Sequence, residues 1–149
     1  MAHTRETVKR DYPLPAYNFR VTVDGAAMSF AEVSGIAVQY DEVTYRHGLS
    51  FVEGEQIATF YYDSFLPVTL KRGTILSSDP LYLHAWLKAK EPRTVEVHLC
   101  DETGTPVISW RLARAVPTKL EAPAFDAGAN EAAVESVELK ARGVSLVQS

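Results

Sequence analysis

Residues 132–143 read AAVESVELKARG, a pattern typical of a β-strand that is buried on one side. Successive side chains of a strand point to opposite faces, so alternating polarity gives one dry face and one wet face. The dry face from position 137 onward holds Val137, Leu139 and Ala141, and the wet face holds Ser136, Glu138, Lys140 and Arg142. No residue here is placed for chemistry. The question is whether the charged face meets water outside a small globule or inside a larger assembly.

Alternation of this kind recurs along most of the chain and predicts seven or eight strands. Asp24-Gly25 is a strong turn signal after the first of them, and residues 101–104 (DETG) form a second turn. Pro117 restricts its own segment to a sheet edge or a β-bulge. The predicted strands lie in residues 17–25, 27–35, 36–46, 67–73, 94–100, 107–114, 115–123 and 132–143. We therefore expect a mainly β fold, an antiparallel β-sandwich or barrel with one packed helix.

That helix is expected at residues 79–90, DPLYLHAWLKAK. Asp79 is suited to the N-cap, and Pro80 to the first helical position, where its missing N–H costs nothing. Leu83, Trp86 and Leu87 then form one apolar stripe that faces the core.

The length and composition indicate one domain, residues 1–149, that begins with a loose N-terminal arm over residues 1–16. Hydrophobic residues make up 46% of the chain, which is enough for a core, but no apolar run approaches the ~20 residues of a membrane span. The first residues contain no apolar signal region, so we expect synthesis and assembly in the cytoplasm. A single cysteine excludes an intrachain disulfide. A net charge of −4 argues against tight nucleic-acid binding.

Residues 46–66, RHGLSFVEGEQIATFYYDSFL, have no clear period and are expected to be a long interaction loop. Such segments inside a compact domain are usually functional or disordered, and disordered segments are poor in aromatic residues. This segment is rich in them, which favours a protein–protein contact over burial in the subunit's own core or stacking on a ligand. The aromatic residues are Phe51, Phe60, Tyr61, Tyr62 and Phe65.

Catalytic, cofactor-binding and metal-binding motifs are not found. No P-loop string is present. His98 and Cys100 stand two apart on one predicted strand and are expected to share a face, but two ligands do not make a metal site. A cysteine nucleophile would also need an orienting third group, which the sequence does not suggest. We therefore predict no catalytic residue, no cofactor and no metal, and the chain is not expected to be an enzyme.

The order of motifs, over residues 12–143, resembles the tail tube protein family of contractile phage tails and phage-tail-like contractile injection systems. Trp110 ends a strand-turn-strand unit, residues 115–119 (AVPTK) follow, and Asn130-Glu131 precede the last strand. One departure is that residues 46–66 lack the proline-glycine pair of many members. The motifs, in order, are YPLPAYNFRVTVDG, FAEVSGI, YRHG, VTLKRG, DETGTPVISWRLARAVPTKLEAP and NEAAVESVELKARG.

The resemblance implies a structural subunit that forms six-membered rings, whose sheets join side by side into one inner barrel. Rings would stack into a tube inside a contractile sheath, with DNA or effector cargo passing through the lumen. The implied partners are other copies of the chain, the sheath protein and baseplate or tube-initiator proteins, without specific nucleic-acid binding or membrane insertion. Two alternatives stay open: a paralogous tube-initiator ring at the baseplate, and an unrelated ligand-binding β-barrel. Release of the particle from the cell is also left open.

Two surfaces follow from this reading. A tube has two wet surfaces, so the face with Glu138, Lys140 and Arg142 is expected in the lumen, with the tube exterior or a sheath contact as an equal alternative. The contact between stacked rings is expected at Arg46, His47, Phe51, Phe60, Tyr61, Tyr62 and Phe65.

Overall fold

A computed structural model describes residues 13–46, 57–73 and 81–148, with the backbone alone for residues 45–46 and 57–62. Within this part the chain forms nine strands and one helix. In chain order they are β1 (Phe19–Val23), β2 (Ala26–Met28), β3 (Glu32–Ser34), β4 (Tyr40–Arg46), β5 (Ile57–Asp63), β6 (Leu66–Gly73), α3 (Tyr82–Ala89), β7 (Arg93–Cys100), β8 (Pro106–Glu121) and β9 (Val134–Gln148).

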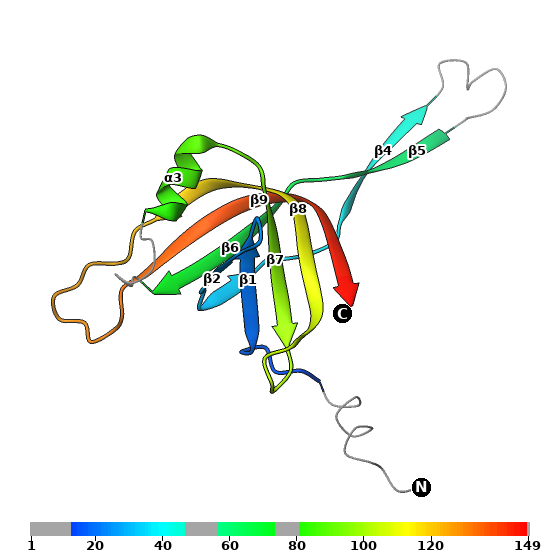
Figure 1. Ribbon diagram of the computed structural model, residues 1–149. Helices are drawn as coiled ribbons and strands as arrows, with labels where there is room; N and C mark the ends of the chain where they lie inside the picture. The colour runs from blue at the N-terminus through cyan, green and yellow to red at the C-terminus, as the bar shows by residue number, and fades with distance from the viewer. Residues whose placement is uncertain (1–12, 47–56, 74–80, 149) are drawn as a thin grey trace, which may run out of the picture.

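Seven strands form one antiparallel sheet in the order β2-β1-β7-β8-β9-β6-β3. Its two outermost strands, β2 and β3, are joined by residues 29–31 alone. A chain advances at most about 3.5 Å per residue, so this link holds the two edges within roughly 14 Å of each other. The sheet must therefore curl strongly, as Figure 1 shows for the long strands β8 and β9. The predicted fold class, mainly β with one packed helix, is confirmed.

The core lies on the inner side of the curled sheet and is covered by α3. Leu83 and Trp86 of the helix are fully buried. The Trp86 indole Nε1 donates to the carbonyl oxygen of Glu91 at 2.7 Å. Arg93 stacks its guanidinium over the rings of Tyr82 and Trp86, at 5.3 and 5.4 Å from their centroids, which fixes the helix on the sheet. The sheet residues of the core are Val21, Val23, Val68, Leu70, Val95, Val97, Leu112, Ala115, Val137, Leu139 and Ala141.

The boundaries of several elements differ from the sequence predictions. The helix begins at Tyr82 with Leu81 as its N-cap residue and no side-chain cap, whereas Asp79 and Pro80 lie outside the described residues. Residues 27–35 divide between β2 and β3, which lie at opposite edges of the sheet. Two consecutive predicted strands form one strand, β8, of 16 residues.

Pro117 lies beyond Ala115, the last residue of β8 that pairs with β7, and the register between β8 and β9 shifts between Pro117 and Lys119. Proline lacks the N–H that a sheet ladder needs, and a bulge removes that requirement. The two predicted settings for this residue, an edge or a bulge, both occur: in the described structure β8 pairs on one side alone at Pro117, and the bulge follows it.

Strands β4 and β5 form a separate antiparallel ribbon with seven registered pairs, from Tyr40 opposite Asp63 to Arg46 opposite Ile57. Residues 57–63, expected to be irregular, are therefore a strand. Their sequence, IATFYYD, is rich in β-branched and aromatic residues, which favour strands. Polar and apolar residues do not alternate in it, so the period of two that indicates a strand is not visible. Figure 1 shows the ribbon extending away from the body of the subunit.

Candidate assembly surfaces

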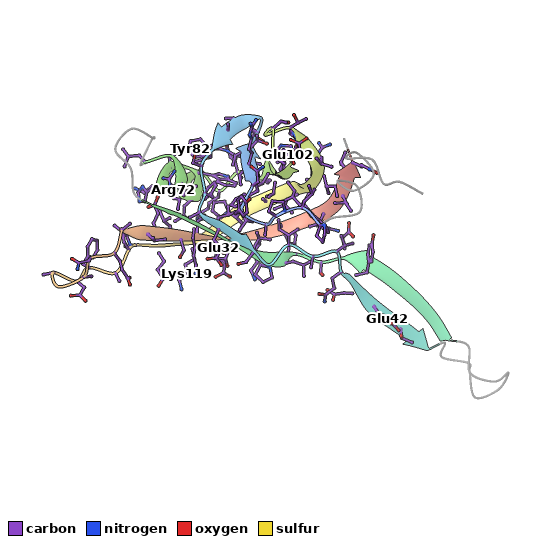
Figure 2. All side chains as sticks on the ribbon, turned by 90° about the horizontal axis from the view of Figure 1, so that it is seen from below. Glu32, Glu42, Arg72, Tyr82, Glu102 and Lys119 are labelled. Carbon is purple, nitrogen blue, oxygen red and sulfur yellow. The ribbon has the colours of Figure 1, made fainter. Side chains whose placement is uncertain are left out.

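The outer face of the sheet over β3, β6, β8 and β9 is polar and lies opposite the helix. Figure 2 shows Glu32 and Lys119 on this face, on the side of the sheet away from Tyr82. Lys71 pairs with Glu32 at 3.7 Å, and Lys119 with Glu121 at 3.9 Å. Ion pairs this exposed contribute little to stability. The face is a hydrated surface, and its charges contribute little to the stability of the fold.

Glu138, Lys140 and Arg142 all lie on this outer face, as the sequence predicts. Glu138 is registered between Thr69 of β6 and Lys119 of β8. The fully buried Val137, Leu139 and Ala141 confirm the alternation that defines the face.

Arg142 marks one end of the outer face and differs from the rest of it. It stands directly opposite Arg114 on β8, so two like charges are adjacent there. Its guanidinium carbon lies 5.6 Å from the centre of the Phe65 ring. Phe65 and Arg142, which the sequence assigns to two different surfaces, are therefore neighbours.

The β4–β5 ribbon carries four of the residues predicted for the contact between rings. Arg46 ends β4, and Phe60, Tyr61 and Tyr62 are consecutive in β5. An isolated two-stranded ribbon is marginally stable in water. Phe65 follows the ribbon, beside the body, and is 48% exposed. His47 and Phe51 lie outside the described residues.

Strand β9 continues beyond the end that the sequence predicts for it. The sequence predicts a strand that ends at Gly143, but β9 continues to Gln148. Gly143 has a φ of +72°, a conformation that residues with a side chain rarely adopt, so it bends the strand without ending it. The alternation of Val144 and Leu146 with Ser145 could have indicated the continuation.

Comparison with known proteins gives the family. Residues 15–145 match the family model described as T4-like virus tail tube protein gp19. The chain belongs to this family. No curated protein matches it.

Solved structures agree with this membership of the tail tube family. A chain of the extracellular contractile injection system PVC, in its sheath-tube complex in the extended state, is 26% identical and superposes with a TM-score of 0.80 over 99% of this chain and 100% of its own. A chain of the anti-feeding prophage cap, the tube-terminating cap, is 28% identical with a TM-score of 0.74 over 93% of each chain. A chain of the baseplate of the same particle, at 20% identity, shares the fold with a TM-score of 0.64 over 93% of this chain and 97% of its own.

His98 and Cys100 make separate contacts in this tail tube protein. The His98 Nδ1 is 2.6 Å from the hydroxyl of Ser109, and its Nε2 is 3.6 Å from a carboxylate oxygen of Glu96. Ser109 is buried.

Cys100 is fully buried, and its thiol donates to the main-chain oxygen of His98 at 3.6 Å, not to the imidazole. The shared face expected for the two residues is wrong because the register between β7 and β8 shifts between Leu99 and Cys100. Within the part of the chain described here, no group of three or more His, Cys, Asp or Glu could hold a metal ion. Nor does the described part include a helix long and apolar enough to cross a membrane.

Proposed function

We propose that this chain is the structural subunit of the inner tube of a contractile tail or injection system. Six copies form a ring, rings stack into a hollow tube, and DNA or effector cargo passes through the lumen. The observation that carries the proposal is the superposition at TM-score 0.80, over nearly the full length of both chains, on a chain of a sheath-tube complex at 26% identity. The sheath protein and the baseplate or tube-initiator proteins are the expected partners, since similar chains occur in sheath-tube, terminator and baseplate structures.

The charged outer face supports a role as the lumen wall. A wall that passes cargo must be hydrated, and it must not hold that cargo tightly. Lys71 and Lys119 are offset by Glu32 and Glu121, which leaves a mixed rather than strongly basic face. Glu138, Lys140 and Arg142 are the proposed lumen residues on β9.

Stacking of rings is assigned to the segment from Arg46 to Leu66. The ribbon within it projects from the body and needs a partner to be stable. The proposed contact residues are Arg46, His47, Phe51, Phe60, Tyr61, Tyr62 and Phe65.

A paralogous ring in the same particle is the second candidate. This candidate is the tube-initiator ring at the baseplate. Chains of the terminating cap and of the tube terminator are each 28% identical to this one, so chains with this fold also occur in rings at a tube end. The two functions differ in copy number per particle. Quantitative mass spectrometry of purified particles should give many copies of a main tube subunit and one ring's worth of an end ring.

We expect the proposed tube subunit to have no catalytic role, because its role in the tube is structural. We expect Cys100→Ser and His98→Ala particles to assemble and deliver normally. Particles that assemble normally but lose delivery would instead indicate chemistry at these residues.

Electron microscopy of the purified protein, alone and with its baseplate partners, tests the proposal. Six-fold rings and hollow tubes are the expected particles. A protein that stays monomeric at high concentration under both conditions would contradict the proposal and favour a ligand-binding β-barrel.

A further inference from the structure

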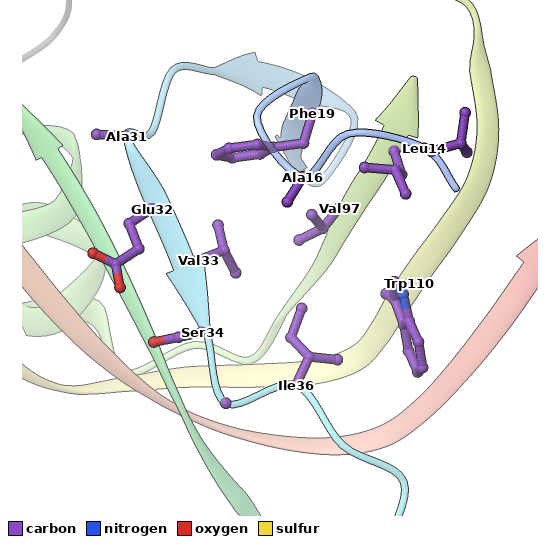
Figure 3. A pocket seen from close by; sticks show the side chains of 12 residues that line it. Leu14, Ala16, Phe19, Ala31, Glu32, Val33, Ser34, Ile36, Val97 and Trp110 are labelled. Atoms are coloured by element: carbon purple, nitrogen blue, oxygen red, sulfur yellow. The ribbon is translucent and has the colours of Figure 1, made fainter. Parts of the chain in front are cut away.

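Two open surfaces in the described part of the chain differ in their chemistry. One is a hollow of about 530 Å³ that is lined mainly by apolar side chains. Figure 3 shows Phe19, Val33 and Ile36 converging on this space, with Trp110 at its side. An acidic ligand would lose its hydration there and would find no cation among the lining residues. The second surface, on the outer face of the sheet, carries basic side chains instead.

The basic cluster consists of Arg114 on β8 and of Lys140 and Arg142 on β9. The strand register places Arg114 directly opposite Arg142, and Val116 opposite Lys140. Lys140 is therefore the diagonal neighbour of Arg114, a distance that long side chains can span. Both arginines are exposed, and Lys140 is partly exposed. The three cations can thus reach one common ligand.

The charges of this cluster have no acidic partner within the described residues. Elsewhere on the same face the lysines are paired, Lys71 with Glu32 at 3.7 Å and Lys119 with Glu121 at 3.9 Å. Like charges that stand directly opposite on neighbouring strands destabilise a sheet. The facing arginines are therefore unfavourable in the isolated subunit, and an acid supplied by a ligand would remove this cost.

Arg142 is held by an aromatic ring that leaves its charge uncompensated. Its guanidinium carbon lies 5.6 Å from the centre of the Phe65 ring, a cation–π contact that orients the planar fork of N–H donors. Phe65 is itself 48% exposed. The cluster is thus bordered by an apolar surface, and a ligand that combines carboxylates with an apolar side chain would match both parts.

The small extent of the cluster favours the carboxylates of a peptide over the phosphates of a nucleic acid. The charges of a nucleic acid are closely spaced along its backbone, so a continuous basic track is needed to bind it. Here Glu138 lies beside Lys140 on the same face of β9, and the whole chain has a net charge of −4. Two arginines and a lysine instead suit one or two carboxylates, each of which can accept two N–H donors from a guanidinium.

We propose that Arg114, Lys140 and Arg142 bind an acidic segment of a protein cargo, with Phe65 contacting an apolar residue of that segment. The inference rests on the proposed function, because a cargo reaches this face if the face lines the lumen. A single site is weak, since its charges are exposed to water. Repetition of the site around every ring holds a cargo by many reversible contacts, so the cargo is retained and can still leave the tube.

Co-sedimentation of assembled tubes with a labelled peptide tests the site. The probe is a glutamate-rich peptide that contains a leucine, and a single-stranded DNA oligonucleotide of equal charge is run in parallel. The parent tubes should bind the peptide more tightly than the oligonucleotide, and added salt should weaken the binding. The double variant Arg114→Gln with Arg142→Gln should bind the peptide at least about tenfold more weakly.

The matched control is the double variant Lys71→Gln with Lys119→Gln. It removes the same charge from the same face, but from lysines that already have acidic partners, and it should bind the peptide within about twofold of the parent. Equal losses in the two double variants would show that binding depends on the net charge of the face, and would overturn the site.

Two results with the parent tubes would also overturn the site. The first is no binding of the peptide, and the second is binding of the oligonucleotide at least as tight as that of the peptide. If the parent protein forms neither rings nor tubes, it is the proposed function that fails. Peptide binding by dispersed subunits that is lost in the arginine variant would then still support the site.

The melting temperature of the dispersed subunit separates binding from a structural role. Arg114→Gln removes one of two facing like charges, so it should leave the melting temperature unchanged or raise it slightly while it weakens peptide binding. A lower melting temperature with unchanged binding would mean that Arg114 supports the fold, and would overturn its place in the site.

Discussion

The two halves of β9 differ although they belong to one continuous strand. In the first half, β6 and β8 lie on either side, and Val137, Leu139 and Ala141 are fully buried. In the second half one neighbour is absent from the described structure, and Leu146 and Val147 are about half exposed. The second half still pairs with β8, from Arg142 opposite Arg114 to Gln148 opposite Ile108, so it continues past β6 on one side only. The first half builds the core of the fold, and the second half leaves apolar side chains exposed in the single subunit.

Truncation of a core residue should show the largest difference between the halves. Leu139→Ala removes a fully buried side chain and should lower the free energy of unfolding by about 3–5 kcal/mol. Leu146→Ala should lower it by less than about 1 kcal/mol, because that side chain is already exposed in the single subunit. Chemical denaturation of both variants checks the values. Equal losses would mean that the two halves contribute alike to the fold.

The ion pair at the start of β9 should show the next largest effect. Arg72 of β6 is buried, and its guanidinium forms an ion pair with Glu135, which is registered opposite it. Glu135→Ala leaves a buried charge without this partner and should cost about 2 kcal/mol, less than a fully buried pair because the Glu135 side chain is 16% exposed. The measurement is again chemical denaturation, with Glu138→Ala on the outer face as the control. A Glu135→Ala subunit as stable as the control would show that Arg72 does not depend on this pair.

The ribbon should affect assembly without affecting the subunit. The double change Tyr61→Ala with Tyr62→Ala should leave the melting temperature nearly unchanged and yield single rings but few long tubes, counted by electron microscopy. Tubes of normal length would exclude these residues as the stacking contact. Unfolding of the double variant would place the two aromatic rings in the subunit's own core.

The outer face should show the smallest effect. Replacing Glu138, Lys140 and Arg142 together with glutamine should change the free energy of unfolding by less than about 1 kcal/mol, since exposed charges contribute little. Tubes should form normally, and a change confined to cargo loading or delivery would support the lumen assignment. A loss of sheath binding, measured by co-purification, would instead place the face on the tube exterior.

The sequence predicted much of the body of the molecule and less of its extensions. The alternation of polar and apolar residues predicted the core face of β9 at Val137, Leu139 and Ala141. The apolar stripe predicted the burial of Leu83 and Trp86 on α3. Both predictions succeeded because burial on one face of an element leaves a periodic pattern in the sequence. The residues of β5, IATFYYD, do not alternate in polarity, and β5 was missed for this reason. Residues 144–148 were missed because Gly143 resembles a strand end.

The resemblance to tail tube proteins was correct, yet the order in which the strands pair could not be predicted from the sequence. Strand order depends on contacts between distant segments, such as β1 with β7 and β6 with β9. The neighbours His98 and Cys100 were predicted to share a face, and one register shift separated them. Local patterns do not encode a bulge of this kind, since it arises from how two strands match each other.

Hydrogen–deuterium exchange on dispersed and assembled protein tests the division of β9 most directly. In dispersed subunits, the amides of residues 134–141 should be protected, and those of residues 142–148 that face away from β8 should exchange quickly. On assembly, protection of residues 142–148 should rise to the level of the first half, with little change elsewhere in the sheet. Tubes that form while residues 142–148 keep exchanging at the rate of the dispersed subunit would contradict the account.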